Sequence, residues 1–172
     1  VNPKLAVALT GRKGDALEAY KKLLLQLNNE VAAQAPADLV INTHVCRGNY
    51  HSTFFSSGAY DGVADLLFGE ENVNAYYLEY DDERSGGFAP LAKVSGDKKV
   101  VLGLVTTKSP VLEKKEDVIA RIHEAAKHVP FDRLYLSPQC GFASCEIGNK
   151  LTEEEQWAKL KLVKEIAEEV WR

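Results

Sequence analysis

The sequence predicts an α/β fold in which four parallel strands alternate with helices, as in the C-terminal half of a (β/α)8 TIM barrel. Short apolar segments of strand character alternate with helical periodicity at spacings of roughly 25–40 residues, a pattern typical of βαβ units. A helix precedes the first strand, and the 172 residues fall short of the roughly 250 of a complete barrel. A small, open, doubly wound sheet is the alternative that this pattern leaves open.

The helices are identified by apolar residues that recur at three- and four-residue intervals and by the residues that bound them. They are predicted at residues 15–33, 61–68, 115–128 and 152–171. The first follows Gly14, the second ends before Gly69, and the third ends before Pro130. Thr152 and Glu155 have the spacing of a capping box, which predicts where the last helix begins.

The strands are short runs rich in β-branched and aromatic residues. They are predicted at residues 37–43, 75–79, 100–105 and 133–137. Four parallel strands bury both faces of a sheet but leave two unpaired edges, which proteins normally cover. We therefore expect those edges to need a partner.

Composition excludes several classes of protein. Lysine and arginine number 21 against 25 aspartates and glutamates, and this net charge of −4 lacks the basic surface of a nucleic-acid-binding protein. No apolar run approaches the roughly 18 residues of a membrane helix. Three cysteines are too few for a disulfide scaffold and no secretory signal is visible, so a cytoplasmic protein is expected.

Three of the four predicted strands end at or beside a residue that can bind a metal. His44 and Cys46 follow the first strand, and side chains two apart on an extended chain point to the same side. Glu79 ends the second strand, and Cys140 follows the fourth. Active sites of parallel sheets and barrels form at the C-terminal ends of the strands, so these side chains should meet there. One imidazole, one carboxylate and two thiolates make a tetrahedral zinc site.

Each candidate ligand also has an ordinary interpretation. A lone buried cysteine is usually a small hydrophobic residue, and Glu79 precedes an acidic, solvated loop at residues 81–87. Cys145 could be a disulfide partner of Cys140 or a spare ligand, but a simple loop thiol is the plainer interpretation. The remaining histidines, expected on the surface, are His51, His123 and His128.

Several short motifs occur in an order that resembles a known family. They are Thr43-His44-Val45-Cys46-Arg47-Gly48-Asn49, Leu78-Glu79-Tyr80-Asp81, Lys108-Ser109-Pro110 and Ser137-Pro138-Gln139-Cys140-Gly141-Phe142. With them, essentially the whole chain resembles the second half of the C-terminal catalytic barrel of cobalamin-independent methionine synthase. It is more similar still to the shorter, single-barrel methionine-synthase-like proteins of that family, whose barrel belongs to a superfamily that includes uroporphyrinogen decarboxylase.

The resemblance implies that His44, Cys46, Glu79 and Cys140 bind Zn²⁺. It also implies an enzyme that transfers a methyl group from a methyltetrahydrofolate-type donor to the thiol of homocysteine, giving methionine. A thiol with a pKa near 8.5 is weakly nucleophilic at pH 7, and zinc deprotonates it. Two thiolates and one carboxylate leave the zinc site at a net charge of about −1, which disfavours activation of water. Glu79, the hard oxygen ligand, is expected to yield its place to the incoming sulfur.

Two features depart from the family pattern. Lys108 stands where methionine synthases carry a histidine proposed to protonate the departing folate nitrogen, and it could donate a proton or bind an anionic substrate group. The family's segments that bind homocysteine and folate come largely from the first half of the barrel, which this sequence lacks.

The missing half also bears on how the chain is organised. The sequence contains no methionine and has Val1 at its first position, which agrees with a piece of a longer chain. We therefore expect residues 1–172 to be one domain and a fragment. It should pair with the missing N-terminal half or self-associate through open strand edges, and alone it could be inactive.

Other functions stay open at this point. One is a corrinoid-dependent thiol methyltransferase of the same superfamily, and another is a catalytically inactive metal-binding fragment. A redox role for Cys140 and Cys145 fits less well, because their spacing exceeds that of a Cys-x-x-Cys motif.

Overall fold

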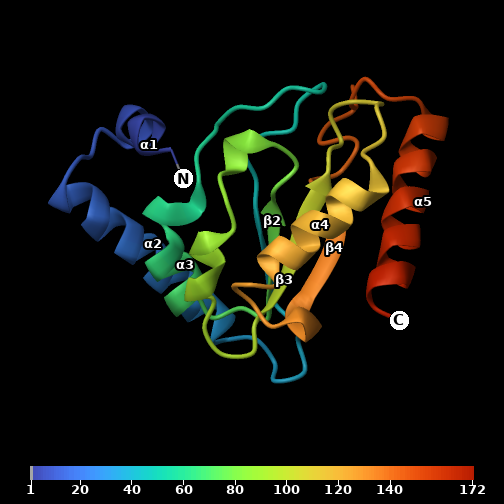
Figure 1. Cartoon of the computed structure of the whole chain (residues 1–172). Coiled ribbons are helices and arrows are strands. Elements are labelled where there is room, and N and C mark those ends of the chain that lie inside the picture. Colours follow the sequence, from blue (N-terminus) through green and yellow to red (C-terminus); the bar gives the residue numbers. More distant parts are fainter. Residues whose placement is uncertain (1) are drawn as a thin grey trace.

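The computed structural model describes residues 2–172 and contains a four-stranded parallel sheet (Figure 1). Its strands are β1 (Asn42–Val45), β2 (Ala75–Glu79), β3 (Lys99–Val105) and β4 (Leu134–Pro138). They lie side by side in the order of the sequence. A doubly wound sheet reverses its strand order at a switch point, whereas consecutive neighbours are the arrangement of a barrel. The predicted arc of a (β/α)8 barrel is therefore confirmed over the open doubly wound alternative.

Five α-helices accompany the described strands (Figure 1). They are α1 (Pro3–Thr10), α2 (Asp15–Ala32), α3 (Ala64–Glu70), α4 (Lys115–Ala125) and α5 (Glu153–Val170), with short 3-10 helices η1 (Tyr60–Gly62), η2 (Glu83–Ser85), η3 (Ala89–Lys93) and η4 (Phe131–Arg133). The capping box is confirmed, because the Thr152 side chain accepts from the Glu155 backbone N–H while the Glu155 carboxylate accepts from the N–H of Thr152.

The two faces of the sheet differ sharply in burial. Paired residues of a parallel sheet point to the same face, and the row of Tyr76, Val100 and Leu134 is at most 1% exposed. Residues of α3, α4 and α5 pack with this row in one hydrophobic core. On the opposite face the next row contains Tyr77 and Tyr135, which are 39% and 41% exposed. The helices thus cover one face, and the described chain leaves much of the other open, as expected for half a barrel.

The predicted first strand is wrong in its position. Residues 37–41 were expected to belong to it, but β1 begins only at Asn42, which pairs with Ala75, the first residue of β2. Leu39 and Val40 instead lie exposed after the Pro36 turn. Their apolar character resembles that of a strand, but a strand also needs a ladder of backbone partners, and the ladder with β2 begins only at Asn42 and Ala75. The shift places His44 inside β1 rather than after it.

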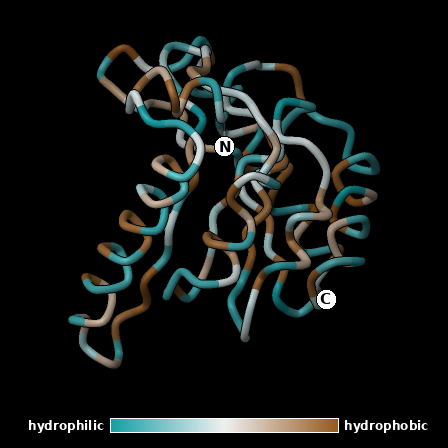
Figure 2. Tube along the Cα trace, turned by 90° about the vertical axis from the view of Figure 1, so that its left-hand side faces the viewer, coloured by the Kyte–Doolittle hydropathy of each residue, from teal (hydrophilic) through white to brown (hydrophobic). Residues whose placement is uncertain are grey.

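Helix α1 was not predicted, although its boundaries carry clear signals. The Asn2 side chain accepts a hydrogen bond from the N–H of Leu5, Pro3 occupies the first turn, and Gly11 ends the helix with φ 68°. No residue of α1 or α2 is buried against the described chain. Figure 2 shows hydrophobic residues recurring along α2 and in the segment that follows it.

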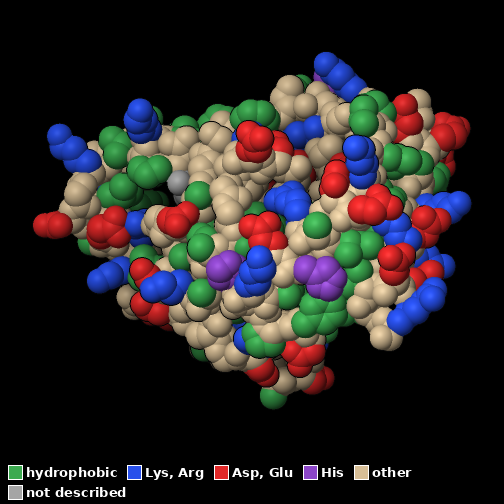
Figure 3. Space-filling view, viewed as in Figure 1, with side chains coloured by type: hydrophobic (Ala, Val, Ile, Leu, Met, Phe, Trp, Pro, Cys, Tyr) green, Lys and Arg blue, Asp and Glu red, His purple; other side chains and the backbone are tan. Residues whose placement is uncertain are grey.

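Charged side chains of both signs are interspersed over the face seen in Figure 3. Along α5 they include the pairs Lys161–Glu165 and Lys164–Glu168. Among residues 2–172, no helix combines the length and the apolar character needed to cross a membrane.

Candidate metal centre

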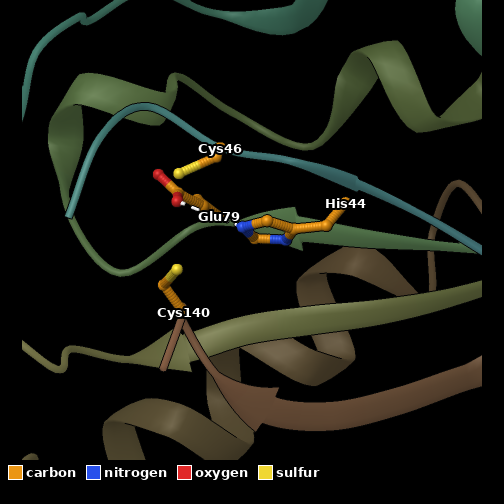
Figure 4. A group of neighbouring side chains, drawn as sticks. All are labelled: His44, Cys46, Glu79 and Cys140. Carbon is orange, nitrogen blue, oxygen red and sulfur yellow. Dashed lines mark ion pairs between the residues drawn. The ribbon is translucent and has the colours of Figure 1, made fainter. Parts of the chain in front are cut away.

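Four side chains that can bind a metal gather at the C-terminal ends of the strands. His44, Cys46, Glu79 and Cys140 each offer a ligand atom, and these atoms lie within 4.8 Å of one another. Figure 4 shows the four side chains pointing toward one another, with His44, Cys46 and Glu79 grouped together and Cys140 opposite them. The structure therefore brings together all four residues selected from the sequence.

Strand register explains this convergence. His44 pairs with Tyr77, so continuing the same register places Cys46 beside Glu79, which in turn pairs with Gly103 of β3. These positions share the open face of the sheet because they lie two residues further along each strand. Cys140 follows two residues after Pro138, the end of β4. Parallel strands that end at one edge thus bring together side chains that are far apart in sequence.

A backbone carbonyl group orients the imidazole of His44. Its Nδ1 lies 3.1 Å from the carbonyl oxygen of Tyr77, and a carbonyl can only accept, so Nδ1 carries the hydrogen. This leaves Nε2 to face the cluster, 3.6 Å from Glu79 Oε1. A backbone carbonyl that fixes the tautomer in this way is a common support for a histidine that binds a metal.

Glu79 is fully buried and its two carboxylate oxygens differ. Oε2 accepts a hydrogen bond of 3.1 Å from the backbone N–H of Arg47. Oε1, which faces His44, accepts no hydrogen bond from any of residues 2–172. Tyr60 fixes the backbone, because its hydroxyl accepts from the N–H of Glu79 and donates to its carbonyl oxygen. A buried carboxylate oxygen without a donor is costly unless a cation occupies the space in front of it.

The protonation equilibria indicate a strongly negative site. Interaction with the Cys140 sulfur, and then with the Glu79 carboxylate, raises the pKa of His44 to about 10, so its imidazole holds a proton at pH 7. The proximity of His44 lowers the pKa of the Cys140 thiol, whereas burial raises the pKa of Cys46. Burial opposes ionisation of Glu79, but the His44 imidazole beside Oε1 and the hydrogen bond from the Arg47 N–H to Oε2 lower its pKa overall. Without a metal, a proton on His44 supplies the cation that this cluster demands.

These residues fit a divalent, thiophilic ion. The donor set contains two sulfurs, one imidazole nitrogen and one carboxylate oxygen, the combination that zinc prefers at four-coordinate sites. Both thiols are free, so neither is held in a disulfide. The unpartnered Glu79 Oε1 and the oriented Nε2 of His44 both face the cluster.

Other cysteines and histidines lie outside this group. Cys145 is an exposed free thiol, so neither a disulfide with Cys140 nor a place among the four clustered ligands is found in the described chain. The His51 ring contacts the carbonyl oxygen of Gly148, and His123 stacks on Phe131.

Lys108 approaches the site without contacting a ligand atom directly. Its Nζ donates a 2.5 Å hydrogen bond to Oε1 of Gln139, the residue before Cys140. Gln139 is 2% exposed, and no role was assigned to it from the sequence. Arg47 was also missed: its guanidinium is buried and donates to Tyr60 Oη and to the carbonyl oxygen of Glu79. Both residues stand inside the recognised motifs, but only the fold reveals what their side chains contact.

Known proteins resemble this chain over most of its length. Two relatives from Bacillus subtilis (strain 168), the uncharacterized proteins YxjH and YxjG, are 54% and 50% identical over 156 and 160 residues. These matches cover 90% and 92% of this chain but 41% and 42% of the relatives. The chain thus spans well under half the length of the relatives that it matches.

Solved structures agree with this comparison. A provisionally assigned vitamin B12-independent methionine synthase from Listeria monocytogenes aligns with a TM-score of 0.70 and 36% identity, covering 94% of this chain and 43% of that one. A B12-independent methionine synthase from Shewanella sp. W3-18-1, in complex with selenomethionine, aligns with a TM-score of 0.65 at 21% identity, which supports the fold alone. That match covers 87% of this chain and 46% of the Shewanella chain.

The family model described as the catalytic domain of cobalamin-independent synthase matches residues 20–169. This range contains all four strands and all four clustered side chains. The chain belongs to the cobalamin-independent methionine synthase family.

Proposed function

We propose that the chain is the zinc-binding part of a methyltransferase that transfers a methyl group from a methyltetrahydrofolate-type donor to the thiol of homocysteine. The observation that carries this proposal is the convergence of His44, Cys46, Glu79 and Cys140 within 4.8 Å. Zn²⁺ held by these side chains would lower the pKa of a substrate thiol beside it, so that the thiol reacts as a thiolate near pH 7.

The chain's own residues prepare this chemistry. The carbonyl oxygen of Tyr77 keeps Nε2 of His44 directed at the site, and the N–H of Gly48 donates to the Cys46 sulfur over 3.3 Å. Such N–H bonds stabilise a thiolate and moderate its own reactivity. A cavity of about 260 Å³ lies next to the cluster and is lined in part by His44, Tyr77 and Cys140. It offers a thiol of the size of homocysteine a place beside the ligands.

Metal analysis of the full-length protein tests the proposal. We expect about one zinc per chain, retained in Cys145→Ser and lost in Cys140→Ser or His44→Ala. Cys145→Ser is the matched control, because it removes an exposed thiol outside the cluster. A protein that neither contains zinc nor binds it at micromolar concentration would contradict the proposal.

The methyl donor decides between the remaining functions. Methylation of homocysteine with methyltetrahydrofolate as donor supports the proposed reaction. Transfer from methylcobalamin alone would instead indicate a corrinoid-dependent thiol methyltransferase. Full zinc occupancy with no methylation from either donor would indicate an inactive metal-binding protein.

We further propose that residues 1–172 act as one domain whose open sheet face and edges are completed by the first half of a barrel. Tyr77 and Tyr135 are partly exposed on that face, and the chain aligns with 43% and 46% of the two solved structures. The segments that hold the amino-acid part of homocysteine and the methyl donor would come from that half. Sedimentation of the chain alone should give self-associated species, and coexpression with the first half of a related barrel should give a one-to-one complex. A monodisperse monomer in both experiments would contradict this arrangement. A cytoplasmic location stays a prediction.

A further inference from the structure

Gln139 lies beside the cluster with one end of its amide occupied and the other free. Its Oε1 accepts hydrogen bonds from Lys108 Nζ at 2.5 Å and from Thr107 Oγ1 at 3.0 Å. A lysine ammonium can only donate, so these contacts fix which end of the amide is the oxygen. The Nε2 end is buried and finds no acceptor among residues 2–172.

A matching acceptor is close by. Glu79 Oε1 is buried and lacks a donor within the same described chain, so one donor and one acceptor are both unpaired in one small region. The Gln139 side chain lies close to the Glu79 carboxylate, although neither Gln139 Nε2 nor Glu79 Oε1 has a well-formed hydrogen bond within the described chain. Buried polar groups are rarely left unpaired. An unpaired donor close to an unpaired acceptor therefore indicates that one of the two side chains has a second conformation in which they form a hydrogen bond.

Rotation of the carboxylate would bring Oε1 to such a position. Oε2 is held by the N–H of Arg47, so the group can pivot about Oε2 and swing Oε1 away from His44. Because the Glu79 side chain is 0% exposed, a carboxylate that leaves a metal cannot turn to water for a hydrogen bond. A buried carboxylate oxygen without a donor is strongly destabilised, and the free Nε2–H of Gln139 would supply the missing donor to Oε1.

We propose that Gln139 is a positioning residue that receives Glu79 when a substrate thiolate takes the place of its carboxylate at the metal. In such an exchange Oε1 of Glu79 would accept from Nε2 of Gln139, and the carboxylate would stay anchored through Oε2. The substrate thiolate would replace one anionic group by another, and the proton released from the thiol would pass to solvent. Lys108 supports the exchange because its ammonium polarises the amide at Oε1 and strengthens the donor at Nε2. This inference rests on the proposed function.

The test separates binding of the thiol from binding of the metal. In Gln139→Glu, an oxygen replaces Nε2 while the acceptor for Lys108 and Thr107 is kept. Gln139→Met removes the donor without adding a charge, which guards against a protonated glutamic acid that could still donate. Thr107→Val is the matched control, because it removes a contact at the Oε1 end and leaves Nε2 able to donate.

The full-length protein, loaded with Zn²⁺ or Co²⁺, is titrated with L-homocysteine. X-ray absorption of the zinc form counts sulfur neighbours, and the sulfur-to-cobalt charge-transfer band of the cobalt form gives the thiol affinity. Wild-type protein should change from two sulfur neighbours to three with loss of one oxygen. Both Gln139 variants should bind homocysteine about tenfold more weakly or worse, with metal affinity changed by less than about threefold, whereas Thr107→Val should lose less than about threefold in thiol affinity.

The outcomes are distinguishable. If wild-type protein gains no sulfur neighbour, the proposed function fails together with this inference. If wild-type protein gains one and the Gln139 variants bind homocysteine equally well, only the role of Gln139 is overturned. Loss of metal affinity in these variants would also overturn it, since Gln139 would then support the resting ligands rather than the displaced one.

Discussion

Replacing Gly103 with alanine should disturb both the sheet and the metal site. Gly103 pairs with Glu79 on one side and Ser137 on the other, in the row that faces the cluster. An extra residue of β3 separates the pairs at Gly103 and Val105, and such a bulge bends the strand that carries it. The absence of a side chain at Gly103 lets the chain at Gln139 cross directly over it.

The size of the effect follows from the space available. A Cβ at Gly103 would lie 2.8 Å from the carbonyl oxygen of Leu78 and 2.9 Å from Cα of Gln139, and both of these atoms belong to the backbone. Ordinary contact begins near 3.4 Å, so the strands must separate by about half an ångström. Overpacking of this kind costs about 1–3 kcal/mol. It also displaces the segment that carries Cys140 by more than the roughly 0.2 Å that ligand distances tolerate.

Urea unfolding and competition with a chromophoric chelator measure the two effects in Gly103→Ala. We expect a loss of about 2 kcal/mol in unfolding free energy and at least about a tenfold loss of zinc affinity. Gly62→Ala is the matched control, because a Cβ there meets nothing within 4 Å, and neither quantity should change appreciably. Gly103→Ala protein with the stability and zinc affinity of the parent would refute the reasoning.

Two further outcomes are expected. Zinc binding at pH 7 should release at least about two protons, one from His44, whose pKa is raised to about 10, and one from Cys46, whose pKa is also raised. Zinc affinity should therefore increase with pH up to about 10, the pKa of His44. Calorimetry in buffers of different ionisation enthalpy measures the number of protons released, and release of no proton would contradict the prediction. Lys159→Met should lower the unfolding free energy by about 2–3 kcal/mol, because it leaves Glu113, whose side chain is 20% exposed, without its buried ammonium partner. Lys161→Met, which removes an exposed pair on the same helix, should change it by less than about 0.5 kcal/mol, and equal losses for the two variants would contradict this ranking.

The sequence was informative where function depends on the end of a strand. Strand ends are readable from short apolar runs, and parallel strands deliver their ends to one edge. His44, Glu79 and Cys140 could therefore be grouped before their geometry was known, even though the first strand was placed several residues too early. The misplaced first strand did not change which residues were grouped as candidate ligands. His44 and Cys46 are two residues apart whether they lie inside the strand or after it.

Sequence patterns did not predict the residues that position the four clustered side chains. Whether Gln139 points at Lys108 or at solvent depends on side-chain conformation and on the close crossing over Gly103. Likewise, the role of Tyr60 depends on η1, in the connection between β1 and α3, packing below the end of β2. These contacts join residues of different strands and loops, so the spacing of residues within one segment does not predict them.

The positive charge of Arg47 and the negative charge of the four clustered side chains stabilise one another. The guanidinium is 1% exposed, yet it donates to neutral acceptors, namely the carbonyl oxygens of Gly58 and Glu79 and the hydroxyl of Tyr60. A buried cation without a carboxylate contact is expensive unless negative charge lies nearby. The ionised Glu79 side chain and the easily ionised Cys140 supply that charge. Arg47 also follows Cys46 directly and holds Glu79 Oε2 through its backbone N–H, so the same residue tethers one ligand and offsets the charge of the others. The opposite charges of Arg47 and Glu79 can therefore both be buried at the C-terminal end of the sheet.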